Sequence, residues 1–118
     1  MKVFYVNEKE AKEIEMDNKL DAYYALLKCR CFTIAQRKVG ETYYDIYCDD
    51  EGLLTEAPRV SAINGKMEPM LVGNLIFTHS TYDGETVGIT SKDVKNIAKH
   101  TFLAVTNRGT HPVVTMEY

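Results

Sequence analysis

The sequence predicts an α+β fold, in which a single domain holds a mainly antiparallel sheet built from hairpins, with two helices packed on one face of it. Three observations support this prediction. Short apolar runs alternate with glycine-containing turns, as β-hairpins require. Two other segments carry apolar residues at helical spacing. The 118 residues contain no linker, repeat or low-complexity segment, and this length is typical of one domain. We therefore expect 1–118 to form one domain.

The first hairpin is expected near the N-terminus. Lys2–Val6 is rich in valine and aromatic residues, which favour strands. After a polar turn at Asn7–Glu10, the segment Ala11–Met16 alternates apolar and acidic residues. A period of two is typical of a strand with one solvated face.

The first helix is expected over about 18–28. Asn18 is a favourable N-cap residue, and Asp21 completes a pattern similar to a capping box. Lys28 suits the C-terminal end of the helix dipole. The residues at helical spacing that should form the buried stripe are Leu20, Tyr23, Tyr24 and Leu27.

The second hairpin is expected from Cys29–Lys38 and Tyr43–Cys48, whose β-branched and aromatic residues surround a turn containing Gly40. The run Asp49-Asp50-Glu51-Gly52 should end its second arm. Three adjacent acids disfavour a strand, and glycine supplies the positive φ that many turns need.

The middle of the chain is expected to contain one short helical turn and a third hairpin. Pro58 is poorly tolerated in a central strand, so Arg59–Ile63 is expected to form a single helical turn. Met70–Ser80 is the most apolar run and is expected to be one buried strand. Asp83-Gly84 favours a type I′ turn, which would return the chain as a strand at Thr86–Ile89.

The second helix is expected over about 91–102, with Thr90 as N-cap and Asp93 reaching back to complete a capping box. Its apolar stripe would be Val94, Ile97, Ala98 and Phe102. The remaining residues, 103–118, are expected to be a C-terminal extension or an edge strand, because Pro112 is tolerated at an edge.

Four stretches, DEGLLTEAPRVSAI, PMLVGNLIFT, DGE and GITSKDVKNI, resemble a known family. They are similar to domain of unknown function 3846, small proteins carried mostly by phages and other bacterial mobile elements. The resemblance covers about residues 2–99. Its most specific pieces are Asp50-Glu51-Gly52, Pro58-Arg59 with Ala62, and Leu71-Val72-Gly73. These are structural motifs, so the resemblance implies a fold and an origin but no catalytic or binding residue.

The composition disfavours nucleic acid and membrane partners. The net charge of −3 is too mild for electrostatic binding to nucleic acid, although Lys92, Lys95 and Lys99 would form a small basic helix face. No run approaches the roughly 20 apolar residues that span a bilayer, and the apolar run at the N-terminus is too short for a signal peptide. Three cysteines are too few for a disulfide scaffold. We expect a protein of the bacterial cytoplasm with reduced thiols.

The cysteines raise two chemical hypotheses. Cys29 and Cys31 would share one face of a strand, and with Cys48 and His79 they would make four zinc ligands. Their spacing is shorter than zinc pairs usually have, so packing as small apolar side chains is favoured. A nucleophile pair of Cys48 with His79 or His100 has no local signature. We expect no metal, no cofactor and no catalytic residue.

The candidate binding residues are Tyr43, Tyr47, Asp50, Glu51 and Arg59. Tyr43 and Tyr47 share one face of a strand. Either that face is covered by a helix, or it is exposed and available to a homodimer partner or a host protein. Asp50 and Glu51 are adjacent, so they point in different directions and favour a solvated turn over a cation site.

The resulting expectation is a non-enzymatic accessory protein of a phage or mobile element that binds a host macromolecule or another copy of itself. The alternative is a small-molecule-binding or thiol-dependent enzyme domain.

Overall fold

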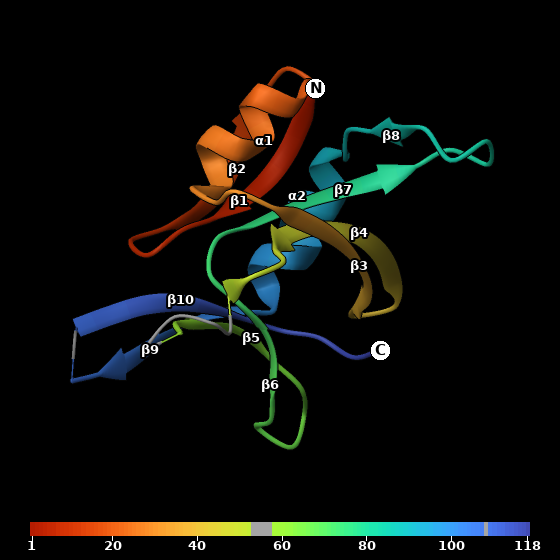
Figure 1. Cartoon of the computed structure of the whole chain (residues 1–118). Coiled ribbons are helices and arrows are strands. Elements are labelled where there is room, and N and C mark those ends of the chain that lie inside the picture. Colours follow the sequence, from red (N-terminus) through yellow and green to blue (C-terminus); the bar gives the residue numbers. More distant parts are fainter. Residues whose placement is uncertain (53–57, 108) are drawn as a thin grey trace.

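A computed structural model describes residues 1–52, 58–107 and 109–118, and its described part is an α+β domain with two sheets and two helices (Figure 1). The larger sheet has the order β2-β1-β7-β4-β3, with β8 paired to β7, and the smaller has the order β6-β5-β10-β9. The helices are α1 (Leu20–Leu27) and α2 (Ser91–Lys99). The strands are β1 (Lys2–Val6), β2 (Ala11–Glu15), β3 (Phe32–Val39), β4 (Thr42–Asp49), β5 (Val60–Ile63), β6 (Pro69–Val72), β7 (Leu75–Ser80), β8 (Thr86–Val87), β9 (Thr101–Thr106) and β10 (Gly109–Thr115).

The three expected hairpins are confirmed. β1 pairs with β2, β3 with β4, and β7 with β8, all antiparallel. The one parallel pair among the described strands is β5 with β10. Within the described residues, no helix has the length and apolar character needed to cross a membrane.

The larger sheet has an apolar core on each face, so the expectation that both helices lie on one face is wrong. Val3 and Tyr5 of β1 pack in the same cluster as Tyr23 and Leu27, below α1. The alternate residues of β1 pack in a second cluster with Ile97 of α2 and with residues of the smaller sheet. Figure 1 accordingly shows α1 above the larger sheet and the smaller sheet below it. Central strands with apolar residues at successive positions need cover on both faces.

The run Met70–Ser80 forms two strands in different sheets, which corrects the expectation of one. β6 ends at Val72 and β7 begins at Leu75. Between them Gly73 takes a φ of 77°, which glycine adopts without strain. The N–H of Gly73 donates a 2.8 Å hydrogen bond to the carbonyl of Arg59. A single glycine therefore carries the chain from one sheet to the other.

The expectation of a helical turn at Arg59–Ile63 is wrong. Val60–Ile63 forms the strand β5, and Arg59 directly precedes it. Pairing with β6 on one side and β10 on the other determines this conformation. Pro58 lies just before the strand, where its missing N–H removes no hydrogen bond from the ladder.

The C-terminal part forms two strands of the smaller sheet, so the expected helix to residue 102 is wrong, and the strand that contains Pro112 is a central strand instead of the expected edge strand. α2 ends at Lys99, where the hydroxyl of Thr101 donates to the carbonyl of Ile97 at 2.7 Å. Phe102 lies in β9, and β10 lies between β5 and β9. The run Asn107-Arg108-Gly109-Thr110 also predicts a turn, but Arg108 lies outside the described residues.

The first helix is capped differently from the prediction. Its N-cap is Lys19, with no side-chain cap among the described residues. The amide oxygen of Asn18 instead accepts a 2.6 Å hydrogen bond from the hydroxyl of Tyr23. Of the predicted stripe, Tyr23 and Leu27 are buried, whereas Leu20 and Tyr24 are exposed. The capping box of α2, formed by Thr90 and Asp93, is confirmed.

Candidate functional site

A cavity of about 1030 Å³ opens on the face of the smaller sheet that points away from the core. The register pairs Phe102 with Val113 and Ala104 with His111, so these four side chains share one face of β9 and β10. Apolar residues therefore make up most of the cavity floor. Apolar side chains from other elements, Pro58, Val60, Ile63 and Met67, extend the lining, and Glu8, Lys9 and Arg59 form its charged rim. The rest of the lining is Thr106, Asn107, Gly109 and Thr110, from the end of β9 and the start of β10.

Arg59 is the best-anchored charged group of this rim. Its Nη2 donates a 2.7 Å hydrogen bond to the side-chain oxygen of Asn74, and its Nη1 lies 3.8 Å from a carboxylate oxygen of Glu8. Its Nε is buried and has no hydrogen-bond partner among the described residues. Burial lowers the pKa of the guanidinium, which remains a cation at neutral pH.

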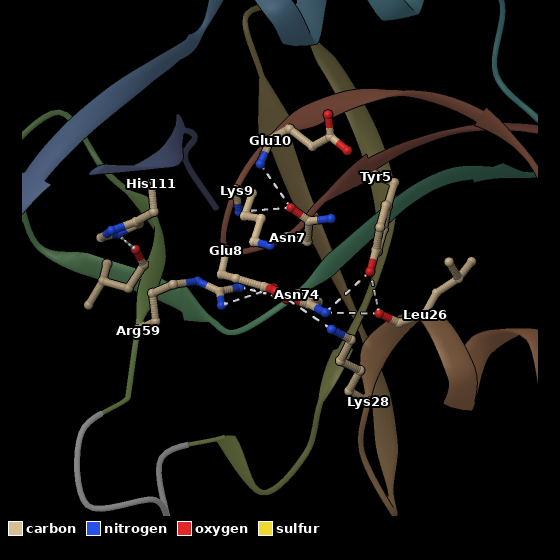
Figure 2. Close-up of polar contacts among 11 residues, drawn as sticks. Tyr5, Asn7, Glu8, Lys9, Glu10, Leu26, Lys28, Arg59, Asn74 and His111 are labelled. Atoms are coloured by element: carbon tan, nitrogen blue, oxygen red, sulfur yellow. Dashed lines mark hydrogen bonds and ion pairs between the residues drawn. The ribbon is translucent and has the colours of Figure 1, made fainter. Parts of the chain in front are cut away.

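Asn74 links this arginine to the end of α1 (Figure 2). Its amide nitrogen donates to the carbonyl of Leu26 at 2.9 Å and to the hydroxyl of Tyr5 at 3.3 Å. The same hydroxyl donates to Leu26 at 2.6 Å, and burial raises the pKa of Tyr5. Because hydrogen bonds join the guanidinium to Asn74, and Asn74 in turn to Tyr5 and Leu26, Arg59 is held in one orientation at the cavity wall.

Glu8 and Lys9 reach the cavity from the turn between β1 and β2. The side-chain oxygen of Asn7 accepts hydrogen bonds of 2.8 Å from the backbone N–H groups of Lys9 and Glu10, which closes an Asx-type turn. The carboxylate of Glu8 lies 3.6 Å from Lys28 and 3.8 Å from Arg59. A hydrogen bond from its own backbone N–H contributes most to lowering the pKa of Glu8, and these two cations add to the effect.

His111 adds a further polar group to the lining. Its Nε2 lies 3.0 Å from the carbonyl oxygen of Val60, which can only accept, so Nε2 carries the proton. Glu8, the one carboxylate among the described lining residues, is already engaged by two cations. The cavity therefore offers an apolar floor and hydrogen-bonding groups, which suit binding better than acid–base chemistry.

A second polar cluster surrounds the start of α2. Asp93 lies 3.0 Å from Nε2 of His79 and accepts a 2.9 Å hydrogen bond from the hydroxyl of Tyr44, whose ring stacks on that histidine. Burial alone would raise the pKa of Asp93, but hydrogen bonds from Thr90 and Tyr44 and the charge of His79 lower it. Since Asp93 also completes the capping box, the cluster stabilises the helix N-terminus.

Of the predicted binding residues, Arg59 alone lines the cavity. Tyr47 is 6% exposed and stacks on Tyr23 with ring centroids 4.2 Å apart. The helix α1 therefore covers the strand face at Tyr47, which is the first of the two alternatives that the sequence left open. Tyr43 is 50% exposed near the C-terminus, where its hydroxyl lies 3.4 Å from the carbonyl of Tyr118. The two tyrosines do not form one exposed surface.

Asp50 and Glu51 lie in the turn after β4, away from the cavity lining. The backbone N–H of Glu51 donates to the carboxylate of Asp49 at 2.9 Å, and its side chain pairs with Arg30 at 3.0 Å. This arrangement is a polar turn with an exposed ion pair, which contributes little to stability. Residues 53–57 of the family-like stretch DEGLLTEAPRVSAI lie outside the described residues.

The three thiols lie in different environments, and the expected shared strand face is wrong. Cys29 and Cys31 precede β3, whereas Cys48 is buried within β4. Burial raises the pKa of Cys29, a hydrogen bond to Glu51 raises that of Cys31, and burial raises that of Cys48 to about 11. No group of three or more metal-ligating side chains occurs among the described residues. Reactive thiolates need a lowered pKa, so thiol chemistry has no support here.

Sequence reasoning missed most of the cavity, including Lys9, Met67, Phe102 and His111. These residues come from four separate segments, and no local pattern links them. Phe102 was assigned to a helix stripe. A strand assignment for 101–106 would have been the one usable signal, because alternation would then have placed Phe102 and Ala104 together.

The chain belongs to the family described as a domain of unknown function, DUF3846, whose family model matches residues 1–102. No curated protein and no solved structure matches the chain. The matched region ends inside β9, so β10, which supplies His111 and Val113 to the cavity floor, lies beyond it.

Proposed function

We propose that this member of DUF3846 is a binding module rather than an enzyme, and that its cavity receives an apolar segment of another protein. The observation that carries the proposal is the cavity of about 1030 Å³ on the smaller sheet, with its largely apolar floor and its mixed rim of Glu8, Lys9 and Arg59.

Two features favour a protein segment over a small metabolite. The cavity volume of about 1030 Å³ lies just above the roughly 300–1,000 Å³ that is usual for small-molecule sites. Its border also exposes apolar side chains, with Met67 71% and Phe102 40% exposed. Methionine and phenylalanine are enriched at protein interfaces, where their exposure is relieved by the partner.

The charges of the rim indicate the chemistry of the partner. Among the described residues, two cations, Lys9 and Arg59, and one anion, Glu8, line the cavity. The carboxylate of Glu8 is already paired with Arg59 and Lys28. The described rim therefore has more positive than negative charge left to attract a partner. An apolar segment with an acidic flank would complement this rim.

The biological setting rests on the sequence resemblance to phage and mobile-element proteins. In this proposal the chain acts in the cytoplasm of a bacterial host and binds a host protein or a protein of the same element. Nucleic acid remains a poor partner, since the net charge of the chain is −3.

The test compares Met67→Asn with Tyr82→Asn. Met67 has a φ of 64°, a region that asparagine tolerates, so this substitution should remove the apolar contact and leave the fold intact. Tyr82 is fully exposed in the turn between β7 and β8 and does not line the cavity, so its variant is the control.

Each tagged protein would be used to isolate partners from bacterial lysate, and the recovered partner would then be purified and titrated by calorimetry. We expect Met67→Asn to weaken binding about tenfold, which corresponds to about 1.4 kcal/mol, while Tyr82→Asn binds as the wild type does. Equal affinities for all three proteins would place the partner elsewhere and refute the proposal.

A further inference from the structure

β9 is the outermost strand of the smaller sheet among the described residues, and its sequence, TFLAVT, has no charged residue and no proline. The edges of natural sheets usually carry such groups, because they prevent pairing with another chain. The outer strands β2 and β3 of the larger sheet are charged, and β6 begins with Pro69. The β9 edge therefore differs from β2, β3 and β6, and at six residues it is longer than the two-residue β8.

The side chains along this edge are also left in solvent. Leu103 is 64% exposed and Val105 is 82% exposed. Both lie on the face opposite to Phe102 and Ala104, so β9 presents apolar side chains on each of its faces. Exposed apolar side chains on both faces of an open edge are typical of a strand that pairs with another strand.

The position of Pro112 indicates which backbone groups of β9 point outward. In an antiparallel pair, opposite residues alternate between hydrogen-bonded and non-hydrogen-bonded positions. Pro112 lies opposite Leu103 and has no N–H to donate, which suits a non-hydrogen-bonded position. The N–H and C=O of Leu103 then point to the open edge, together with those of Thr101 and Val105.

We propose that a second copy of this chain pairs antiparallel with β9 about a two-fold axis at Leu103. Antiparallel pairing across such an axis keeps the same face of both sheets on one side. Of the registers that use outward-facing residues, the one centred on Leu103 engages all three of them. It pairs Leu103 with its own copy and Thr101 with Val105.

The strand is complementary to itself in this register. Phe102 lies opposite Ala104 of the second copy, which places a large side chain against a small one. Leu103 meets Leu103, and the methyl group of Thr101 meets Val105. No charged residue lies between 101 and 107, so pairing brings no like charges together. A charged foreign peptide would find no opposite charge on β9, whereas a second copy matches the strand side chain by side chain, which makes the second copy the favoured occupant.

The pairing would join the two smaller sheets into one continuous sheet. Phe102 and Ala104 line the cavity, so both cavities would open on the same side of that sheet, next to the two-fold axis. This inference does not depend on what the cavity binds, and its tests do not involve the cavity partner.

The first test measures the mass of the protein in solution by analytical ultracentrifugation over a range of concentrations. The wild type should associate to twice the chain mass of 13.4 kDa. Leu103→Lys should remain a monomer with an unchanged circular dichroism spectrum. The matched control is Leu20→Lys on α1, because Leu20 is also 64% exposed, and this variant should still dimerise.

The second test examines the register by oxidation of cysteine variants in which Cys29 and Cys31 are serine, so that the buried Cys48 is the one native thiol left. In the proposed pair the two Leu103 Cα atoms lie about 5.5 Å apart, within the range that a disulfide spans. The two Val105 Cα atoms lie at least about 13 Å apart, beyond that range. Leu103→Cys should form a covalent dimer on oxidation, and Val105→Cys should not.

A wild type that remains a monomer at its highest soluble concentration would overturn the proposal. A dimer that survives Leu103→Lys, or that Val105→Cys links as readily as Leu103→Cys, would place the interface elsewhere and overturn it equally.

Discussion

Arg59 and Asn74 join the two sheets through a 2.7 Å hydrogen bond between Nη2 of the arginine and Oδ1 of the asparagine. Arg59 lies directly before β5 of the smaller sheet, and Asn74 lies directly before β7 of the larger one. The backbone reinforces the contact, since the carbonyl of Arg59 accepts from the N–H of Gly73. The contacts that connect the two sheets therefore also fix the position of Arg59 in the cavity wall.

This junction predicts energetic coupling between the two residues. Arg59→Leu and Asn74→Ala should each lower the free energy of unfolding by about 1–3 kcal/mol, because each leaves a buried polar partner without its hydrogen bond. The double variant should lose less than the sum, with a coupling of about 0.5–3 kcal/mol. Urea unfolding followed by circular dichroism would measure the cycle. Strict additivity would show that the contact is not an energetic link.

Gly73 predicts a purely conformational effect. Its φ is 77°, and a Cβ placed there would meet no atom within 4 Å. Gly73→Ala should therefore destabilise the fold by about 1–2 kcal/mol through backbone strain alone. Gly65→Ala is the control, since Gly65 is not among the positive-φ glycines and its Cβ would meet only a side-chain oxygen of the exposed Glu117, at 3.2 Å. Equal unfolding free energies for Gly73→Ala and the wild type would contradict this account of the strand break.

The corrected cap of α1 predicts a stabilising substitution. Lys19 occupies the N-cap with extended φ and ψ, and no described side chain caps the helix. Lys19→Asp should add an acceptor for the first-turn N–H groups and raise the free energy of unfolding by about 0.5–1 kcal/mol. Asn18 is not the N-cap, so Asn18→Ala should leave the capping of α1 unchanged. It should lower the free energy of unfolding, because the 2.6 Å hydrogen bond from the hydroxyl of Tyr23 is lost. Thermal melts of both variants would separate the two positions.

Asp93 predicts a dependence of stability on pH. Its pKa is lowered from 3.8 in the folded chain, so the unfolded state binds a proton first as pH falls. The stabilisation is present above the unfolded pKa and is lost as pH falls through the lower folded pKa. Asp93→Asn should thus cost most at pH 7 and progressively less below about pH 4. Urea midpoints at both pH values would check this, and a cost independent of pH would contradict it.

The thiols predict a clear order of reactivity. Cys48 is buried with its pKa raised to about 11, so it should stay protonated and unmodified by iodoacetamide at pH 8 in the folded protein. Cys31 is exposed and should react first. Mass spectrometry of peptides after timed labelling would give the order. Fast labelling of Cys48 without unfolding would revive the thiol-dependent alternative.

The sequence alone determined the local elements whose signals lie within a few residues. Alternation defined the hairpin of β1 and β2, the glycine-centred turn defined that of β3 and β4, and Thr90 with Asp93 defined the start of α2. These features depend on propensity, turn chemistry and capping, which act between near neighbours. The same local motifs also carried the family resemblance.

Only the tertiary structure decided how these elements share two sheets. The short segment Val60–Ile63 became a strand because β6 and β10 pair with it, and 109–115 became central because β5 and β9 flank it. The cavity that joins Glu8, Arg59, Phe102 and His111 follows from that pairing. Strand pairing between distant segments is chosen by burial and by hydrogen bonds of the whole chain, so no local pattern could reveal it.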